Sequence, residues 1–226
     1  MKKIYVIVLL ISLMPALAFA QSLKQAQKAM DRYDYTTAVQ ILKKAVADPT
    51  DHDEAVLMLA ECYRMQRDIF NTKAWYANAV TIPNVKPEAF LYYGQALQAT
   101  GDYSLARQMF QKYETMAGNG KGRRFATACD SVLGPWKGIK PTFQINNVHT
   151  INTAQSDFGA AFYNSALIFA SDYIPQTSSK QYGWTGRGYL DIMQSFPTAP
   201  EEFFGEMGKP SKFAKEFNQM YQDVLS

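Results

Sequence analysis

The side chains that could support acid–base or metal chemistry are few and scattered. The two histidines, His52 and His149, are far apart, and neither has a cluster of further ligand side chains at metal-binding spacing. Asp51, Asp53 and Glu54 surround His52, a pattern more typical of a helix N-terminus, where carboxylates interact favourably with the helix dipole. The sequence therefore predicts no metal site and no cofactor.

Two other patterns have a chemical and a structural interpretation. The glycine-rich segment 118–122 is not preceded by a strand pattern and lacks the Gly-Lys-Ser/Thr ending of a phosphate loop, so a linker is favoured. Asp157 and Asp172 flank candidate strands, where they would either contact a cation or ligand or cap turns, and turn capping is favoured. No nucleophile elbow or Ser/His/Asp grouping occurs, and we expect a chain that is not an enzyme.

Small and aromatic residues recur in the first half of the chain every 34 residues. Three ladders keep this spacing: Ala38, Thr72 and Ala106; Leu42, Tyr76 and Phe110; and Ala26, Ala60 and Gly94. A strict period of this length is typical of helix–turn–helix repeats, in which each unit buries its apolar face only by stacking on a neighbour. The spacing therefore predicts a stack of helical hairpins, an architecture that serves binding more often than catalysis.

The turns agree with this period. Tyr33-Asp34-Tyr35 and Gly101-Asp102-Tyr103 precede the second helices of the first and third units, and Thr50 with Asp53 is expected to cap the helix that opens the second. Ladders and turns together resemble the tetratricopeptide repeat over roughly Ser22–Tyr113, although Arg67-Asp68-Ile69 lacks the turn glycine. We expect repeats over about 22–50, 51–84 and 85–117 in a domain spanning 21–134, with a capping helix over 122–133.

The resemblance implies an inner face, formed by the first helix of each repeat, that binds a partner protein. In this register the face mixes polar and flexible apolar side chains: Gln27, Met30, Asp31, Leu57, Glu61, Arg64, Met65, Leu91, Gln95 and Gln98. Such a mixture suits an extended peptide, and an ordinary solvated face is the alternative. Gln27, Glu61 and Gln95 stand where carboxylate-clamping members of the family carry asparagine, so that specificity is not expected here.

Residues 1–20 resemble a secretory signal peptide. Lys2 and Lys3 precede an apolar run that is too short to span a membrane, and Ala18-Phe19-Ala20 is a small-x-small cleavage site before Gln21. Cleavage lowers the formal net charge from +3 to +1, which argues against nucleic acid as a partner. We expect an exported chain with no transmembrane span after cleavage, whose Cys62 and Cys129 are buried thiols rather than a disulfide, because repeats separate them.

The pattern changes after Gly134-Pro135-Trp136. A linker is expected over 135–141, followed by short β-branched and aromatic runs over 142–226. The strand candidates are Phe143–Val148, Gly159–Tyr163, Leu167–Ala170 and Gly188–Ile192, with Asn164-Ser165 as a tight hairpin turn. The fold class is thus α+β in separate domains, an α-helical solenoid followed by antiparallel β structure.

The second half also carries a resemblance. Asn152 with the Ser156–Gly159 and Phe169–Asp172 segments is similar to the first blade of the β-propeller in Bacteroidetes OmpA-family outer-membrane proteins with N-terminal tetratricopeptide repeats. Tyr189–Ile192 is similar to that blade's third strand, and Lys212–Asn218 to the lead into a second. Because a propeller needs about four or more blades to close, we expect an incomplete propeller in a fragment or truncated reading frame.

The resemblance implies a non-enzymatic periplasmic scaffold, associated with the outer membrane, that binds a cell-envelope protein through its groove. Some relatives of this layout serve type IX secretion. Peptidoglycan would be bound only through an OmpA domain that this chain lacks. The alternative is the N-terminal part of a propeller-containing envelope hydrolase whose catalytic region lies outside this chain.

Overall fold

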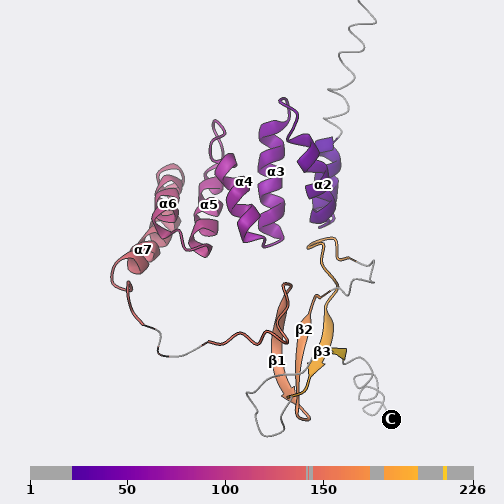
Figure 1. Cartoon of the computed structure of the whole chain (residues 1–226). Coiled ribbons are helices and arrows are strands. Elements are labelled where there is room, and N and C mark those ends of the chain that lie inside the picture. Colours follow the sequence, from indigo (N-terminus) through magenta and orange to yellow (C-terminus); the bar gives the residue numbers. More distant parts are fainter. Residues whose placement is uncertain (1–21, 141, 143–144, 174–180, 198–210, 213–226) are drawn as a thin grey trace, which may run out of the picture. The chain divides into compact units, whose positions relative to one another are not determined.

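The computed structural model describes residues 22–140, 142, 145–173, 181–197 and 211–212. The predicted signal peptide lies outside the described residues, and so do residues 213–218 of the predicted lead into a second blade. The described chain forms two compact units (Figure 1). The helical unit contains the residues up to Lys140 together with the tripeptide Gly183–Thr185, and the β unit contains the remainder.

The described part of the helical unit is a row of three hairpins followed by one further helix (Figure 1). A helix over residues 22–31 pairs with α2 (Tyr35–Ala45), α3 (His52–Met65) with α4 (Ile69–Ala79), and α5 (Pro87–Ala99) with α6 (Tyr103–Ala117). The last helix is α7 (Lys121–Leu133). Contacts among α2–α7 fall mainly between sequence neighbours, which is the arrangement of a tetratricopeptide-like solenoid.

An aspartate is the N-cap of the second helix in each of the three hairpins. Its side chain accepts a hydrogen bond from the backbone N–H three residues later, which satisfies one of the free donors of the helix N-terminus. The three N-cap residues, again 34 apart, are Asp34, Asp68 and Asp102. The capped turn therefore repeats with the same 34-residue period as the buried positions.

The residue before each N-cap has a left-handed backbone. Its φ is 60° at Tyr33, 58° at Arg67 and 82° at Gly101. This conformation costs a residue with a Cβ roughly 1–2 kcal/mol, whereas glycine adopts it readily. The turn glycine that the second hairpin lacks is thus replaced by a strained arginine without loss of the turn.

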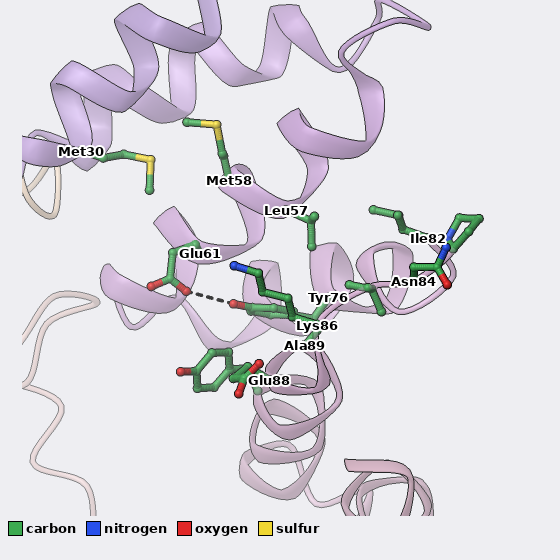
Figure 2. Close-up of a pocket in the computed structure, with 13 residues that line it drawn as sticks. Met30, Leu57, Met58, Glu61, Tyr76, Ile82, Asn84, Lys86, Glu88 and Ala89 are labelled. Atoms are coloured by element: carbon green, nitrogen blue, oxygen red, sulfur yellow. Dashed lines mark hydrogen bonds between the residues drawn. The ribbon is translucent and has the colours of Figure 1, made fainter. Parts of the chain in front are cut away.

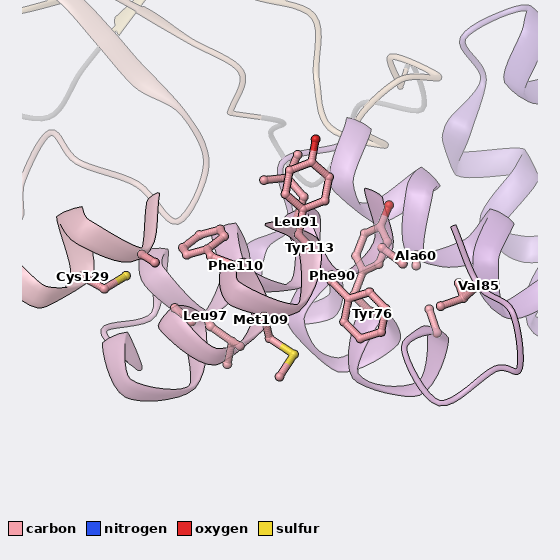
Figure 3. Packing of buried hydrophobic residues seen from close by; sticks show 14 of the residues in the cluster. Ala60, Tyr76, Val85, Phe90, Leu91, Leu97, Met109, Phe110, Tyr113 and Cys129 are labelled. Carbon is pink, nitrogen blue, oxygen red and sulfur yellow. The ribbon is translucent and has the colours of Figure 1, made fainter. Parts of the chain in front are cut away.

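All nine ladder positions are buried, which confirms the 34-residue packing prediction. The third hairpin shows why a small residue is needed where helices cross. A Cβ added to Gly94 on α5 would lie 2.6 Å from Cε1 of Phe110 on α6. Figure 3 shows the side chain of Phe110 within a cluster of buried residues that also includes Leu97 and Met109. At Gly94, therefore, α5 and α6 approach too closely for a larger side chain.

The helix after the third hairpin covers the last apolar surface of the described stack. The rings of Phe110 on α6 and Phe125 on α7 are stacked with centroids 4.9 Å apart. The Glu114 carboxylate accepts hydrogen bonds from the backbone N–H groups of Gly120 and Arg123, at the start of α7. The predicted capping helix is thus held by both apolar and polar contacts with α6.

The β unit contains an antiparallel sheet with strand order β1-β2-β3-β4 (Figure 1). The strands are β1 (Asp157–Tyr163), β2 (Ala166–Ser171), β3 (Asp191–Ser195) and the two-residue β4 (Ser211–Lys212). Asn164 and Ser165 join the first two with φ values of 44° and 65°, the two positive values that a type I′ turn requires, and this confirms the predicted hairpin turn. Ile151 and Phe169 form the small apolar core of this unit.

Three local predictions were wrong. Residues 145–148 of the candidate strand Phe143–Val148 form no strand. The strand predicted at Gly188–Ile192 runs from Asp191 to Ser195, because Asp191 pairs with Ser171, the last residue of β2. Helix α3 is not capped by Thr50 with Asp53: Asp51 occupies the N-cap without a side-chain cap bond, and Asp48 accepts the Thr50 N–H instead.

Candidate functional site

The helical unit contains a pocket of about 500 Å³. Its walls come from the first helix of each hairpin, from Tyr76 on α4, and from the loop between α4 and α5. We call it the inner-face pocket (Figure 2). Its lining residues are Met30, Leu57, Met58, Glu61, Tyr76, Ile82, Pro83, Asn84, Val85, Lys86, Glu88, Ala89 and Tyr92. Most of this surface is apolar, with polar groups at a few defined points, as is usual for a binding pocket.

A network of three side chains forms the polar part of the wall. Glu61 Oε2 accepts hydrogen bonds from Tyr76 Oη at 3.0 Å (Figure 2) and from Arg64 Nε at 2.7 Å. Arg64 Nη2 donates to the other carboxylate oxygen, which makes the ion pair bidentate. Such planar pairs are stronger and more directional than single charge contacts. Glu61 and Arg64 therefore hold each other in position on α3.

Tyr92 extends this network to α5. The Arg64 guanidinium lies 4.2 Å from the centroid of the Tyr92 ring, within cation–π range. The rings of Tyr76 and Tyr92 are 5.7 Å apart and tilted by 58°. These contacts hold the pocket wall together across the second and third hairpins without a bound partner.

The charge states of the network follow from its contacts. Burial disfavours the charged form of Glu61, but the hydrogen bonds and charge of Arg64, with the Tyr76 hydrogen bond, outweigh it and hold the carboxyl pKa below its ordinary value. Burial, reinforced by the Glu61 charge, raises the pKa of Tyr76. At neutral pH the network is therefore a carboxylate, a guanidinium and an un-ionised phenol.

The structure brings some of the predicted groove residues together. Met30, Leu57 and Glu61 line the inner-face pocket, and Arg64 joins it through Glu61. Arg64 also donates to Met65 Sδ at 3.4 Å. Gln27 and Asp31 are exposed on the helix over residues 22–31, where the Gln27 amide donates to the Asp31 carboxylate. These two form a separate polar pair on that helix.

The α5 members of the predicted groove lie elsewhere. Leu91 is only 2% exposed and belongs to the packed core (Figure 3), so it offers no contact surface. Gln95 and Gln98 are half-buried on α5 but do not line the pocket. The α5 residues that do line it are Glu88, Ala89 and Tyr92, because the pocket lies toward the start of that helix.

Sequence reasoning missed part of the lining. Tyr76 was placed in the core by its ladder position, yet its hydroxyl reaches Glu61 at the pocket wall. The 82–86 segment spans the predicted boundary between the second and third repeats and was not predicted to line a site. One signal was available: a tyrosine at a ladder position where the third unit has phenylalanine carries a hydroxyl that must find a partner when buried.

The other candidate residues have structural roles. Asp157 accepts hydrogen bonds from the backbone and hydroxyl of Thr153 and from Ser171, and Asp172 accepts from the Ser156 N–H. These contacts agree with the favoured turn-capping interpretation. Cys62 and Cys129 are buried free thiols, as predicted. Within the described ranges, no group of three or more metal-ligating side chains occurs, and no helix there is long and apolar enough to cross a membrane.

No protein-family model matches the chain, and no curated protein sequence matches it. Among solved structures, the crystal structure of the Sgt2 TPR domain from Aspergillus fumigatus is similar, with a TM-score of 0.45 and 16% sequence identity. The match covers 57% of this chain and 89% of that domain. The tetratricopeptide-like character of the helical unit rests on its own 34-residue repeat of buried positions and turns.

Proposed function

We propose that the helical unit is a non-enzymatic protein-interaction module whose inner-face pocket receives an apolar side chain from an extended segment of a partner protein. The observation that carries this proposal is the pocket itself, about 500 Å³ in volume and lined by side chains from successive hairpins. Met30, Leu57 and Met58 supply flexible apolar surface that adapts to the shape of an inserted side chain. The braced Glu61–Arg64–Tyr76 wall supplies a fixed boundary.

The charges of the wall define the partner further. Glu61 and Arg64 neutralise each other, so neither is free to pair strongly with a ligand. Lys86 extends over the pocket (Figure 2), and among the described residues no carboxylate lies within ion-pairing distance of its ammonium. We infer a partner segment with a methionine, leucine or phenylalanine anchor and a carboxylate beside it.

A random peptide library displayed on phage tests this proposal with the full chain as bait. Selected peptides are expected to share one large apolar residue next to an aspartate or glutamate. Lys86→Glu should weaken their binding about tenfold, because one charge contact becomes a repulsion. Lys24→Glu makes the same change in net charge on the exposed side of the first hairpin and should leave binding unchanged.

Two outcomes would contradict the proposal. Selected peptides without a shared apolar anchor would remove the pocket as the binding site. Equal binding by the Leu57→Ser variant and the unmodified chain would do the same, since that change places a polar group in the pocket wall.

We also propose that the module is exported and works in the periplasm as part of an OmpA-like, outer-membrane-associated protein whose β unit begins a propeller. The support is the signal-like sequence over residues 1–20 and the resemblance of the Ser156–Asp172 region to a first blade. A link to type IX secretion belongs to this same proposal. Fractionation of cells expressing the full chain, with mass spectrometry of its N-terminus, should find a periplasmic protein beginning at Gln21. A cytoplasmic product that retains Met1 would refute export.

A further inference from the structure

Trp184 lies against the turn of the first hairpin, although it comes much later in the sequence than that turn. Its indole Nε1 donates a 2.8 Å hydrogen bond to the carbonyl oxygen of Met65, 119 residues earlier. Its ring stacks on Tyr33 with centroids 5.4 Å apart and planes only 4° from parallel, and it meets Tyr35 edge-on at 5.2 Å. The Trp184 ring is therefore packed against other rings, and its N–H group has a hydrogen-bond acceptor.

The residue before Trp184 is also bound. The Thr36 N–H donates a 3.0 Å hydrogen bond to the Gly183 carbonyl, and a Cβ at position 183 would lie 3.1 Å from an Asp34 carboxylate oxygen. The turn thus binds the main chain of Gly183 and the ring of the tryptophan that follows it. These contacts come from the segment that also N-caps α2, whereas the indole N–H is bound by the Met65 carbonyl at the end of α3.

A comparison of the three turns shows what is special about the first. The strained position before the N-cap is Tyr33 here, Arg67 in the second hairpin and Gly101 in the third. The residue after the N-cap is Tyr35 in the first hairpin, Ile69 in the second and Tyr103 in the third. Only in the first turn of this described series do tyrosines stand on both sides of the aspartate. A strained tyrosine at a position that glycine would occupy without strain points to a role for its side chain. The Tyr33 ring is the one that stacks on Trp184.

We infer that Tyr33, Tyr35 and the Met65 carbonyl form a recognition site for a glycine–tryptophan dipeptide, and that Gly183-Trp184 is its resident occupant. The site is separate from the inner-face pocket, and its ligand is an aromatic peptide segment. Because the occupant is part of the same chain, its effective concentration is of millimolar order. A free peptide of the same chemistry therefore competes poorly until the resident tryptophan is removed.

Fluorine NMR of the full chain labelled with 5-fluorotryptophan tests the resident contact. The sequence has three tryptophans, and Trp184→Phe assigns the relevant resonance. Tyr33→Gly is the sharpest variant, because glycine adopts the left-handed backbone without strain and the turn is preserved while the stacking ring is lost. The Trp184 resonance is expected to move toward that of an exposed tryptophan. Tyr103→Ala removes the tyrosine that follows the N-cap in the third hairpin, as Tyr35 does in the first, and is expected to leave it in place.

A second experiment tests recognition in trans. N-acetyl-glycyl-tryptophanamide is titrated into the full-length Trp184→Ala chain while the Thr36 amide is followed by two-dimensional NMR. We expect saturable shifts at millimolar dipeptide, and binding to the unmodified chain that is weaker by about twofold or more, because the resident segment competes at millimolar effective concentration. A Thr36 amide that does not respond, or that responds equally to N-acetyl-glycyl-leucinamide, would overturn the inference. So would a Trp184 resonance that Tyr33→Gly leaves unchanged. Neither result depends on the inner-face pocket.

Discussion

The Tyr76 hydroxyl on α4 donates a 3.0 Å hydrogen bond to the Glu61 carboxylate on α3. The contact joins the two helices of the second hairpin at the wall of the inner-face pocket. It also gives one ladder residue two roles, because the Tyr76 ring fills the core while its hydroxyl orients a polar group at the surface. Stability and the shape of the binding site are therefore coupled at this point.

Tyr76→Phe removes this hydrogen bond and keeps the ring. We expect a loss of about 1 kcal/mol in the free energy of unfolding, the usual net value of one such bond. Urea denaturation of the full chain measures it. Tyr103→Phe is the control, since no hydrogen bond of its hydroxyl is found among the described residues. An equal loss in both variants would mean that the hydroxyl contributes nothing specific.

The Glu61 carboxyl should make the free energy of unfolding depend on pH in the acidic range. Its pKa is lower in the folded chain than its ordinary value, so its contribution is complete above the ordinary pKa and disappears as the pH falls through the folded one. The stability difference between the unmodified chain and Glu61→Gln is expected to stay constant from about pH 7 to 5 and then to shrink toward about pH 3. Unfolding curves at a series of pH values measure this. A difference that grows on acidification would reverse the assigned sign.

Thr72→Val should stabilise the second hairpin. The Thr72 hydroxyl is buried and has no hydrogen-bond partner among the described residues, at a ladder position where the other units have alanine. An unsatisfied buried polar group costs about 1–3 kcal/mol, and valine keeps both the shape and the branching. We expect a gain of roughly 1 kcal/mol in thermal or urea unfolding. Lower stability would indicate a bridging water in solution.

Gly94→Ala should destabilise the third hairpin. The new methyl would lie 2.6 Å from the Phe110 ring, so α5 and α6 must separate or the ring must leave its position. Overpacking of this kind costs about 1–3 kcal/mol. The double variant Gly94→Ala with Phe110→Leu should lose less than the sum of the single changes, because leucine frees part of that space. Strict additivity would place the strain elsewhere.

The period of 34 residues made the helical half predictable. The buried ladders and the three N-cap aspartates depend on local spacing, because a side chain repeated at this interval returns to the same helix crossing in every hairpin. The β hairpin was equally predictable from Asn164-Ser165, because a two-residue turn determines which residues pair. Strand ends elsewhere were not, since Asp191 begins β3 only because β2 ends at Ser171.

The inner-face pocket was only partly predictable for a different reason. Helical periodicity indicates which side of a helix is apolar, but it does not say how far along the helix a neighbour packs. Leu91 therefore fell in the core, whereas Tyr92, the next residue, reached the pocket. The segment from Ile82 to Lys86 joined the wall through the path of its loop, which no periodicity describes.

The sequence by itself determined the repeat length, the turn chemistry and the change from helix to strand, because each of these depends on residues close together in the chain. Only the tertiary structure decided that Glu61 meets Tyr76 and that Trp184 meets Tyr33. Those contacts do not follow the 34-residue repeat. They form because the packed helices and the tripeptide Gly183–Thr185 bring complementary groups within hydrogen-bonding or stacking distance.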